Sequence, residues 1–428
     1  MNKQAFADAI RAGKADHALR ILYGASPSVL ESQHNRYLHA LRRFSEIFPD
    51  RDDIRLFSAP GRTEIGGNHT DHQHGCALAA AVNLDVIAVV AFHDEGVIRF
   101  DSEGHGRTET DLADLSVRED EKGTSAALIR GIAAKFAAMG VKIGGFDAFS
   151  VSDVLSGSGL SSSAAFETLI GTIINVAYNH CNADEAEIAK IGQYAENVYF
   201  GKGSGLLDQT VCAYGGFVFI DFLDTEKPYV EKYRFDFESA GYHLCITDTK
   251  GSHADLTEDY VAVPREMKSV AAQFGKEYLR EVDEFLFLRS IPSLRGKCSD
   301  RAIMRAVHYF KENRRAIDEA QALDNGDIDR FFDIYRRSAA SSANLLQNHY
   351  ANAKPTEQGI SLGIMMSRLI LGDDAAVRVH GGGFAGTIQA FVPTFKTEEY
   401  VRKMNALYGA GSCYVLRIRP VGGAEITA

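Results

Sequence analysis

The chain has 428 residues, of which 45% are hydrophobic and 24% are charged, and its formal net charge is −11. This length is enough for two or three domains with real cores. The negative charge argues against a nucleic-acid-binding protein, which needs a basic surface to displace the counterions of phosphates. It leaves room for a local basic pocket that binds a small anion.

The N-terminus and the cysteines predict a cytoplasmic protein that does not associate with membranes. Residues 1–24 carry charges throughout and lack the hydrophobic region of a signal peptide. The cysteines lie far apart with no CxxC pair, as is typical of free thiols in a reducing compartment. The most apolar window, "CALAAAVNLDVIAVVAF", is interrupted by Asn83 and Asp85, so we expect no membrane span.

The order of the predicted elements indicates an α+β fold. Residues 1 to about 48 show apolar side chains at helical spacing, and β-rich runs begin at Ile54. The apolar window could be a helix or a strand that leads into a buried strand. Helical patterns return at 124–140 and 162–200, and polar helices cover 256–347. Strands and helices do not alternate strictly, which favours two α+β parts that meet near residue 235.

Three glycine-rich loops are candidates for ligand binding. "SGSGLSSSA" (156–164) runs into an apolar helix, so its N–H groups and the helix dipole could bind an anion. It lacks the lysine of a P-loop and the third glycine of a dinucleotide-binding motif. "HGGGFAGT" (380–387) allows close approach to a ligand or is a tight packing turn. "GKGSGLLDQT" (201–210) presents Asp208, which could be a base, a metal ligand or a residue that stabilises a helix N-terminus.

The segment "GRTEIGGNHTDHQHG" (61–75) places His69, Asp71, His72 and His74 within six positions. Such a cluster could bind a metal, could form hydrogen bonds to a polar ligand, or could be a solvated loop. The HxHxDH pattern of zinc hydrolases would need a histidine where Gly67 stands. We therefore favour binding of a polar ligand over a zinc site.

Together these segments resemble the galactokinase branch of the GHMP kinases. The family motifs GRVNLIGEHTDYxxG, PxGxGLSSSA, GxxDQ and GGGFGG appear in family order as "GRTEIGGNHTDHQHG", "LSGSGLSSSA", "GLLDQ" and "GGGFAG". The resemblance implies a two-domain GHMP kinase fold with the active site in the cleft between the domains. It also implies a helical arm at 1–50, an N-terminal domain at 51–235 that carries the sugar and ATP phosphate loops, and a C-terminal domain at 236–428.

The resemblance also implies a role for each motif residue. Asp208 would be the catalytic aspartate, with Arg62 beside it, and Ser163 and Glu196 would bind Mg²⁺. The residues expected to contact the sugar are Asn68, His69, Asp71, Gly205 and Tyr260. Those expected to bind ATP are Gly157, Ser158, Gly159, Leu160, Ser161, Ser162, Gly382 and Gly383.

Departures from the first motif affect the identity of the sugar. Asn68 replaces a glutamate that contacts the far end of the sugar in the family, Glu64 replaces an asparagine, and Gly66 alters the hydrophobic step. His72 replaces a tyrosine. A neutral amide at 68 would tolerate an acidic sugar, or one that lacks the hydroxyl.

We therefore expect an ATP- and Mg²⁺-dependent sugar 1-kinase that acts on α-D-galactose. The alternatives are a kinase for galacturonate, arabinose or N-acetylgalactosamine, or, in another class, a non-catalytic sensor of galactose and ATP. The sequence does not predict an oligomeric state.

Overall fold

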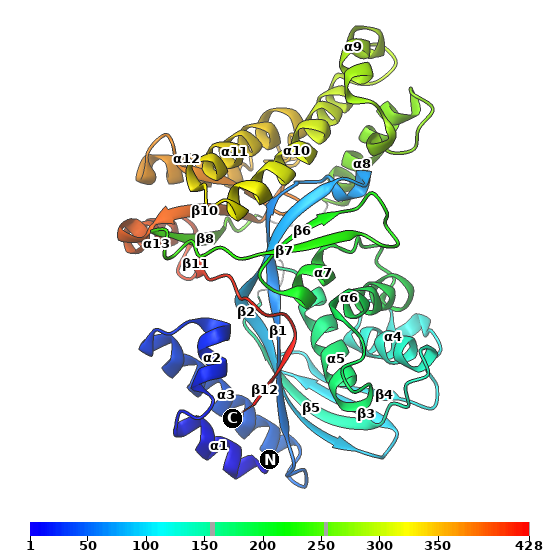
Figure 1. The fold of residues 1–428 in the computed structure, drawn as a ribbon, viewed down its shortest axis with the longest axis vertical. Coiled ribbons are helices and arrows are strands. Elements are labelled where there is room, and N and C mark those ends of the chain that lie inside the picture. The colour runs from blue at the N-terminus through cyan, green and yellow to red at the C-terminus, as the bar shows by residue number, and fades with distance from the viewer. Residues whose placement is uncertain (155–158, 252–255, 428) are drawn as a thin grey trace.

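The computed structural model describes residues 1–154, 159–251 and 256–427. The N-terminal arm consists of three helices, α1 (Lys3–Arg11), α2 (Asp16–Tyr23) and α3 (Pro27–Ile47), which confirms the predicted helical region. These helices pack on one face of the central sheet (Figure 1). Two buried hydrogen bonds reinforce the contact, from Tyr23 Oη and from Arg36 Nη1 to the carboxylate of Asp85, at 2.5 and 2.6 Å. The arm is therefore an integral part of the fold.

The larger sheet runs through the middle of the molecule (Figure 1). Its strand order is β12-β1-β2-β5-β3-β4, and β6 and β7 extend from β2. All its pairs are antiparallel except β3 with β5, which are joined through β4 and α4. The bounds are β1 (Arg55–Gly66), β2 (Cys76–His93), β3 (Val97–Ser102), β4 (Gly106–Asp111), β5 (Gly145–Ser152), β6 (Phe217–Asp221), β7 (Tyr229–Tyr233) and β12 (Ala424–Ile426).

The apolar window forms a single strand, β2, of 18 residues. Its second half is buried on both sides because neighbouring residues point into different cores. Ala88 and Val90 belong to the core beneath the helices that follow, whereas Ile87 and Val89 face the N-terminal arm. A strand covered on both faces reads as a continuous apolar run, so its period of two is hidden in the sequence.

Four helices cover the other face of this sheet and carry two of the predicted motifs. They are α4 (Ser125–Ala138), α5 (Ser162–Tyr178), α6 (Glu185–Tyr194) and α7 (Leu207–Tyr214). A π-helical turn (Ala195–Phe200) follows α6. The serine-rich loop ends where α5 begins, and Asp208 lies in the first turn of α7. Both motifs therefore present helix N-termini.

A second, four-stranded antiparallel sheet has the order β11-β8-β10-β9. Helices α10 to α13 lie around it, and α9 lies at the tip of the molecule (Figure 1). The bounds are β8 (Tyr242–Asp248), β9 (Ala376–His380), β10 (Thr387–Pro393), β11 (Cys413–Leu416), α8 (Thr257–Ala272), α9 (Glu284–Leu294), α10 (Asp300–Asp324), α11 (Ile328–Ser341), α12 (Gly359–Leu371) and α13 (Thr397–Tyr408).

The C-terminal strand does not stay with the second sheet. Ile426 pairs with Leu56, so β12 extends the edge of the first sheet beside β1. The α+β class is confirmed, and the domain boundaries at 50 and 235 remain a prediction. None of the described helices is both long and apolar enough to cross a membrane.

Candidate active site

Arg62 and Asp208 form the centre of the candidate site. Arg62 lies on β1 next to an irregularity in its pairing with β2, between Pro60 and Arg62. Its guanidinium binds both oxygens of the carboxylate, with Nε 2.7 Å from Oδ1 and Nη2 2.9 Å from Oδ2. Arg62 is buried, and 35% of the Asp208 side chain is exposed. The pair thus presents a fixed carboxylate to the outside.

Burial raises the pKa of Asp208, but the Arg62 guanidinium and the Ser161 hydroxyl outweigh it and hold this pKa below its ordinary value. The carboxylate is therefore ionised at neutral pH. An ionised carboxylate held by two charge-assisted hydrogen bonds can orient a hydroxyl or accept its proton.

The glycine-rich loop lies directly against this pair. Gly157 and Ser158 are outside the described residues. Arg62 donates from its backbone N–H to the Leu160 carbonyl at 3.0 Å and from Nη1 to the Gly159 carbonyl. Ser161 has a left-handed backbone, with φ at 58°, and its hydroxyl donates to Asp208. Ser162 begins α5.

Oxygen donors gather next to the N-terminus of α5. The Ser163 hydroxyl donates to Glu196 Oε1 at 3.2 Å, and Gln209 Nε2 donates to Glu196 Oε2 at 2.8 Å. Gln209 also reaches Glu167 at 3.0 Å, and burial raises the pKa of that carboxyl well above its usual value. Lys202 Nζ lies 3.0 Å from Glu196 Oε1. Hydroxyl and carboxylate oxygens are the ligands that Mg²⁺ prefers, so these residues fit that ion.

The predicted sugar-binding residues come from both halves of the chain. His69 Nε2 donates to the Gly382 carbonyl at 2.9 Å, and Tyr260 Oη donates to the Gly383 carbonyl at 2.9 Å. Burial lowers the pKa of His69 to about 4, so its imidazole is neutral at pH 7. Asp71 lies beside Gly205, where an added Cβ would be 3.2 Å from Asp71 Oδ2.

The glycines of the second loop are needed for this close approach. A Cβ at Gly382 would lie 2.5 Å from the ring of Tyr260, and one at Gly383 would lie 2.2 Å from the Asn348 carbonyl oxygen. Both distances are too short for an ordinary side chain. The loop therefore packs tightly on its neighbours, which was one of the two interpretations of the glycine run.

Asn68 lies underneath the sugar loop. It is fully buried, and its amide donates to Glu64 Oε1 and to the Gly381 carbonyl, both at 2.8 Å. Its Oδ1 accepts from Asn348 Nδ2 at 2.9 Å. A direct bond to a sugar would need one of these partners to be given up, so direct contact remains a prediction.

Several residues of the site carried no motif in the sequence analysis. His380 follows Thr63 and Thr387, which lie 2.9 and 2.8 Å from its ring nitrogens, and burial lowers its pKa to about 3. Lys202 stands in the predicted "GKGSG" loop, where a basic residue among glycines was a readable signal. Buried Arg378 on β9 gave no such signal, because a single arginine in an apolar strand has no characteristic spacing.

The histidine-rich segment does not form a metal centre among the described residues, where no group of histidine, cysteine, aspartate and glutamate has a suitable arrangement. His69 is engaged with Gly382, and the His74 ring stacks on Tyr278 with centroids 3.8 Å apart.

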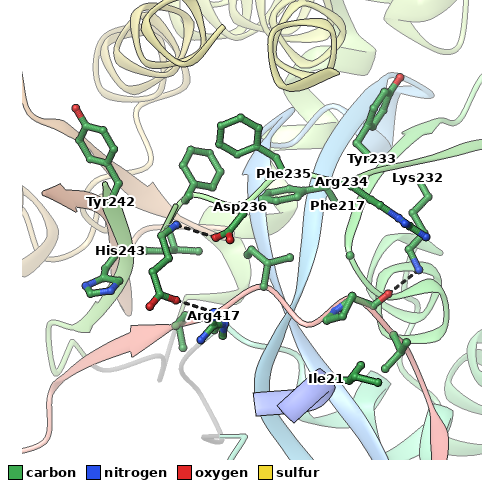
Figure 2. A pocket seen from close by; sticks show the side chains of 18 residues that line it. Ile21, Phe217, Lys232, Tyr233, Arg234, Phe235, Asp236, Tyr242, His243 and Arg417 are labelled. Atoms are coloured by element: carbon green, nitrogen blue, oxygen red, sulfur yellow. Dashed lines mark hydrogen bonds and ion pairs between the residues drawn. The ribbon is translucent and has the colours of Figure 1, made fainter. Parts of the chain in front are cut away.

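A cavity of about 770 Å³ lies away from this site, between β7, β8 and the segment after β11 (Figure 2). Lys232 Nζ donates to the Pro420 carbonyl at 2.8 Å on one side of it, and Arg417 pairs with Glu238 at 2.8 Å on the other. None of the predicted site residues lines this cavity. The candidate active site is therefore assigned from its side-chain chemistry, not from the size of the hollow.

Two family models match the chain. The galactokinase galactose-binding signature matches residues 42–92, and the N-terminal domain of the GHMP kinases matches residues 127–216. The first range contains Arg62, Asn68, His69 and Asp71, and the second contains the serine-rich loop, Glu196, Gly205 and Asp208.

Solved structures share the fold. The Lactococcus lactis galactokinase complexed with galactose is 23% identical and has a TM-score of 0.77, covering 91% of this chain and 99% of that one. The Methanococcus jannaschii mevalonate kinase is 14% identical with a TM-score of 0.61, covering 86% and 98% of the two chains. At these identities the likeness concerns the fold. By this fold and the two matching models, the chain belongs to the GHMP kinases and carries the galactose-binding signature of galactokinases.

Proposed function

We propose that this chain is an ATP- and Mg²⁺-dependent sugar 1-kinase that converts α-D-galactose and ATP to galactose 1-phosphate and ADP. The observation that carries the proposal is the Arg62–Asp208 pair beside the serine-rich loop at the N-terminus of α5. It places an ionised carboxylate, a fixed cation and helix N–H groups in one place. Phosphoryl transfer needs positioning and charge stabilisation of this kind.

The reaction would assign one task to each group. Asp208 would orient the anomeric hydroxyl and take its proton as the hydroxyl oxygen bonds to the γ-phosphorus and the bond to the ADP oxygen breaks. Arg62 would keep Asp208 ionised and offset charge on the transferring phosphoryl. The loop from Gly157 to Ser162 would bind the ATP phosphates. Mg²⁺, when bound near Ser163 and Glu196, would neutralise charge on those phosphates.

Sugar recognition would use the residues around the second glycine loop. His69, Asp71, the Gly205 backbone and Tyr260 would contact or line the sugar, and Gly382 and Gly383 would close the site from the other half of the chain. Asn68 would influence the far end of the sugar. Because position 68 carries no charge, galacturonate, arabinose and N-acetylgalactosamine are proposed as alternative substrates.

The test is ATP turnover with these four sugars and with glucose, in which the sugar 1-phosphate is identified by ³¹P NMR. Galactose 1-phosphate formation supports the proposal, and turnover of another sugar in the panel assigns the alternative. Binding of galactose and ATP by calorimetry without turnover would identify a sensor and would overturn the kinase.

A further inference from the structure

Three departures from the family's first motif meet in one buried cluster. The motif has asparagine at position 64 and glutamate at position 68, and this chain has the reverse, Glu64 and Asn68. The two side chains touch, with Asn68 Nδ2 2.8 Å from Glu64 Oε1. Gly66 lies between them on β1. The carboxylate has thus moved from one member of a contacting pair to the other.

Asn68 uses its entire hydrogen-bonding capacity inside the protein. An amide has two N–H donors and an oxygen with two lone pairs. The donors go to Glu64 and the Gly381 carbonyl, and the oxygen accepts from Asn348 at 2.9 Å and from Ser342 at 3.4 Å. A carboxylate at 68 would have no N–H to offer, and would face two acceptors. As long as Glu64 is ionised, position 68 therefore requires a donor.

The charge of Glu64 is matched from beneath by Arg378. Arg378 Nη2 lies 3.1 Å from Glu64 Oε1, and Nη1 donates to the Ile65 carbonyl at 2.8 Å and to Ser338 Oγ at 3.0 Å. Both Glu64 and Arg378 are buried. Arg378 stands on β9, which leads directly into the second glycine loop. The contact therefore joins β1 of the first sheet to the strand that carries this loop.

Gly66 belongs to the same arrangement. A Cβ at this position would lie 1.7 Å from Glu319 Oε2. Glu319 is fully buried, and neither carboxylate oxygen has a hydrogen-bond partner among the described residues. The hydrophobic residue of the family motif is incompatible with this position of Glu319. The change at 66 thus accompanies the exchange at 64 and 68.

We propose that Glu64 and Asn68 act as one unit, and that Asn68 is a positioning residue that holds the 381–383 loop over the sugar loop instead of contacting the sugar itself. The proposal rests on the proposed sugar-kinase function. Its consequence is that the residue at 68 can be understood only together with the residue at 64. Asn68 sets the position of its neighbour His69, whose Nε2 bonds Gly382.

An isosteric exchange tests this coupling. Asn68→Asp removes the two N–H donors and leaves like charges facing each other. Glu64→Gln keeps an acceptor for Asn68 and removes the charge. The double variant Glu64→Gln/Asn68→Asp restores one donor–acceptor contact in the opposite direction, with the size and net charge of the pair unchanged. All four proteins are compared at pH 8, where Glu64 is ionised because burial raises its pKa only to about 7.

The expected result is a change in sugar binding that the double variant reverses in part. Asn68→Asp should raise the KM for the sugar about tenfold or more, with the KM for ATP and kcat much less affected, and should speed hydrogen exchange at 381–386 to a similar degree. In the double variant both effects should be smaller than in Asn68→Asp. Effects of the two single changes that simply multiply, or a loss of kcat and both KM values together, would overturn the proposal.

A buried asparagine remote from the site provides the matched control. Asn175 on α5 donates to the Ala183 carbonyl at 2.9 Å. Asn175→Asp should lower the melting temperature without faster exchange at 381–386. Hydrogen exchange is measured without substrate, so it separates the two proposals. If the wild-type chain phosphorylates no sugar, the kinase proposal fails while the exchange data still decide whether residues 64 and 68 are coupled.

Discussion

Arg62 and Asp208 stand 146 positions apart in the chain and meet through two hydrogen bonds of 2.7 and 2.9 Å. The pair joins β1 to the first turn of α7, so the position of the carboxylate is fixed by two elements of the larger domain core. The guanidinium is flat and forks toward both oxygens, which sets the direction of the remaining lone pairs as well as their charge.

Asp208→Asn should abolish most turnover while it preserves the fold. The amide is the same size but is a far weaker proton acceptor, and one of its donors would face the Arg62 guanidinium. We expect kcat to fall by about 10²–10⁴-fold or more. Phosphoryl transfer and the thermal unfolding curve check this prediction. Turnover within tenfold of wild type in a folded variant would remove Asp208 from the catalytic role.

Arg62→Lys should both slow the reaction and move its pH dependence. A lysine cannot form the two parallel bonds, so it lowers the pKa of Asp208 less than the arginine does. The pKa of Asp208 should therefore rise, and activity should be lost at a higher pH on the acidic side of the profile. We expect kcat to fall about 10²-fold. A kcat/KM profile from pH 4 to 8 measures the shift, and an unmoved acidic limb would contradict it.

The motif residues were predictable from the sequence because their spacing reflects chemistry, and the structure brings Arg62, Asp208 and the described part of the serine-rich loop together. Lys202, which pairs with Glu196, is close to a motif but has no role in it. The pairing of β12 with β1 was not predictable, since three residues at a chain end have no pattern that names a partner more than 350 positions away.

The buried cluster around Glu64 shows a different limit. The sequence analysis recognised each departure at 64, 66 and 68 and weighed them separately. Only the structure shows that Asn68 contacts Glu64 and that Glu319 lies over Gly66. Glu319 and Arg378 come from a long polar helix and an apolar strand, where a charged residue is ordinarily exposed or unremarkable. Contacts between buried charges depend on tertiary geometry, which one sequence does not contain.

Glu64→Gln should change how stability depends on pH. Burial raises the pKa of Glu64 to about 7 despite the neighbouring Arg378, Arg62 and Asn68, and Asp71 adds to the rise. The folded state therefore binds a proton that the unfolded state has released above pH 4.5. Wild-type stability from this group is fully present below pH 4.5 and is lost as pH rises through 7, by on the order of 3 kcal/mol.

Urea unfolding of the two proteins at pH 4.5, 6 and 8 measures this difference. Glu64→Gln should gain stability relative to wild type as pH rises, because glutamine cannot ionise. The other buried titrating groups are common to both proteins and cancel in the comparison. A difference that does not change with pH would mean that Glu64 does not titrate in this range.

Gly66→Ala should destabilise the protein because the added methyl would meet Glu319 Oε2 at 1.7 Å. We expect a loss of about 1–3 kcal/mol, as is usual for overpacking a rigid core. Combining it with Glu319→Ala should recover part of the loss. Gly203→Ala is the matched control, since its added Cβ meets nothing within 4 Å. Equal unfolding midpoints for Gly66→Ala and Gly203→Ala would contradict the assignment.

Glu196→Gln should raise the Mg²⁺ concentration needed for half-maximal activity. Glu196 is almost fully buried and lies 3.2 Å from the Ser163 hydroxyl, and the amide would supply a weaker, uncharged oxygen. We expect an increase of about tenfold, equivalent to the loss of one charge-assisted contact. Titration of Mg²⁺ at a fixed concentration of ATP measures the effect, and an excess of EDTA should abolish the activity of both proteins. Glu185→Gln, an exposed change on α6, serves as the control. If Glu196→Gln and this control need the same Mg²⁺ concentration, then Glu196 does not contribute to the ion's site.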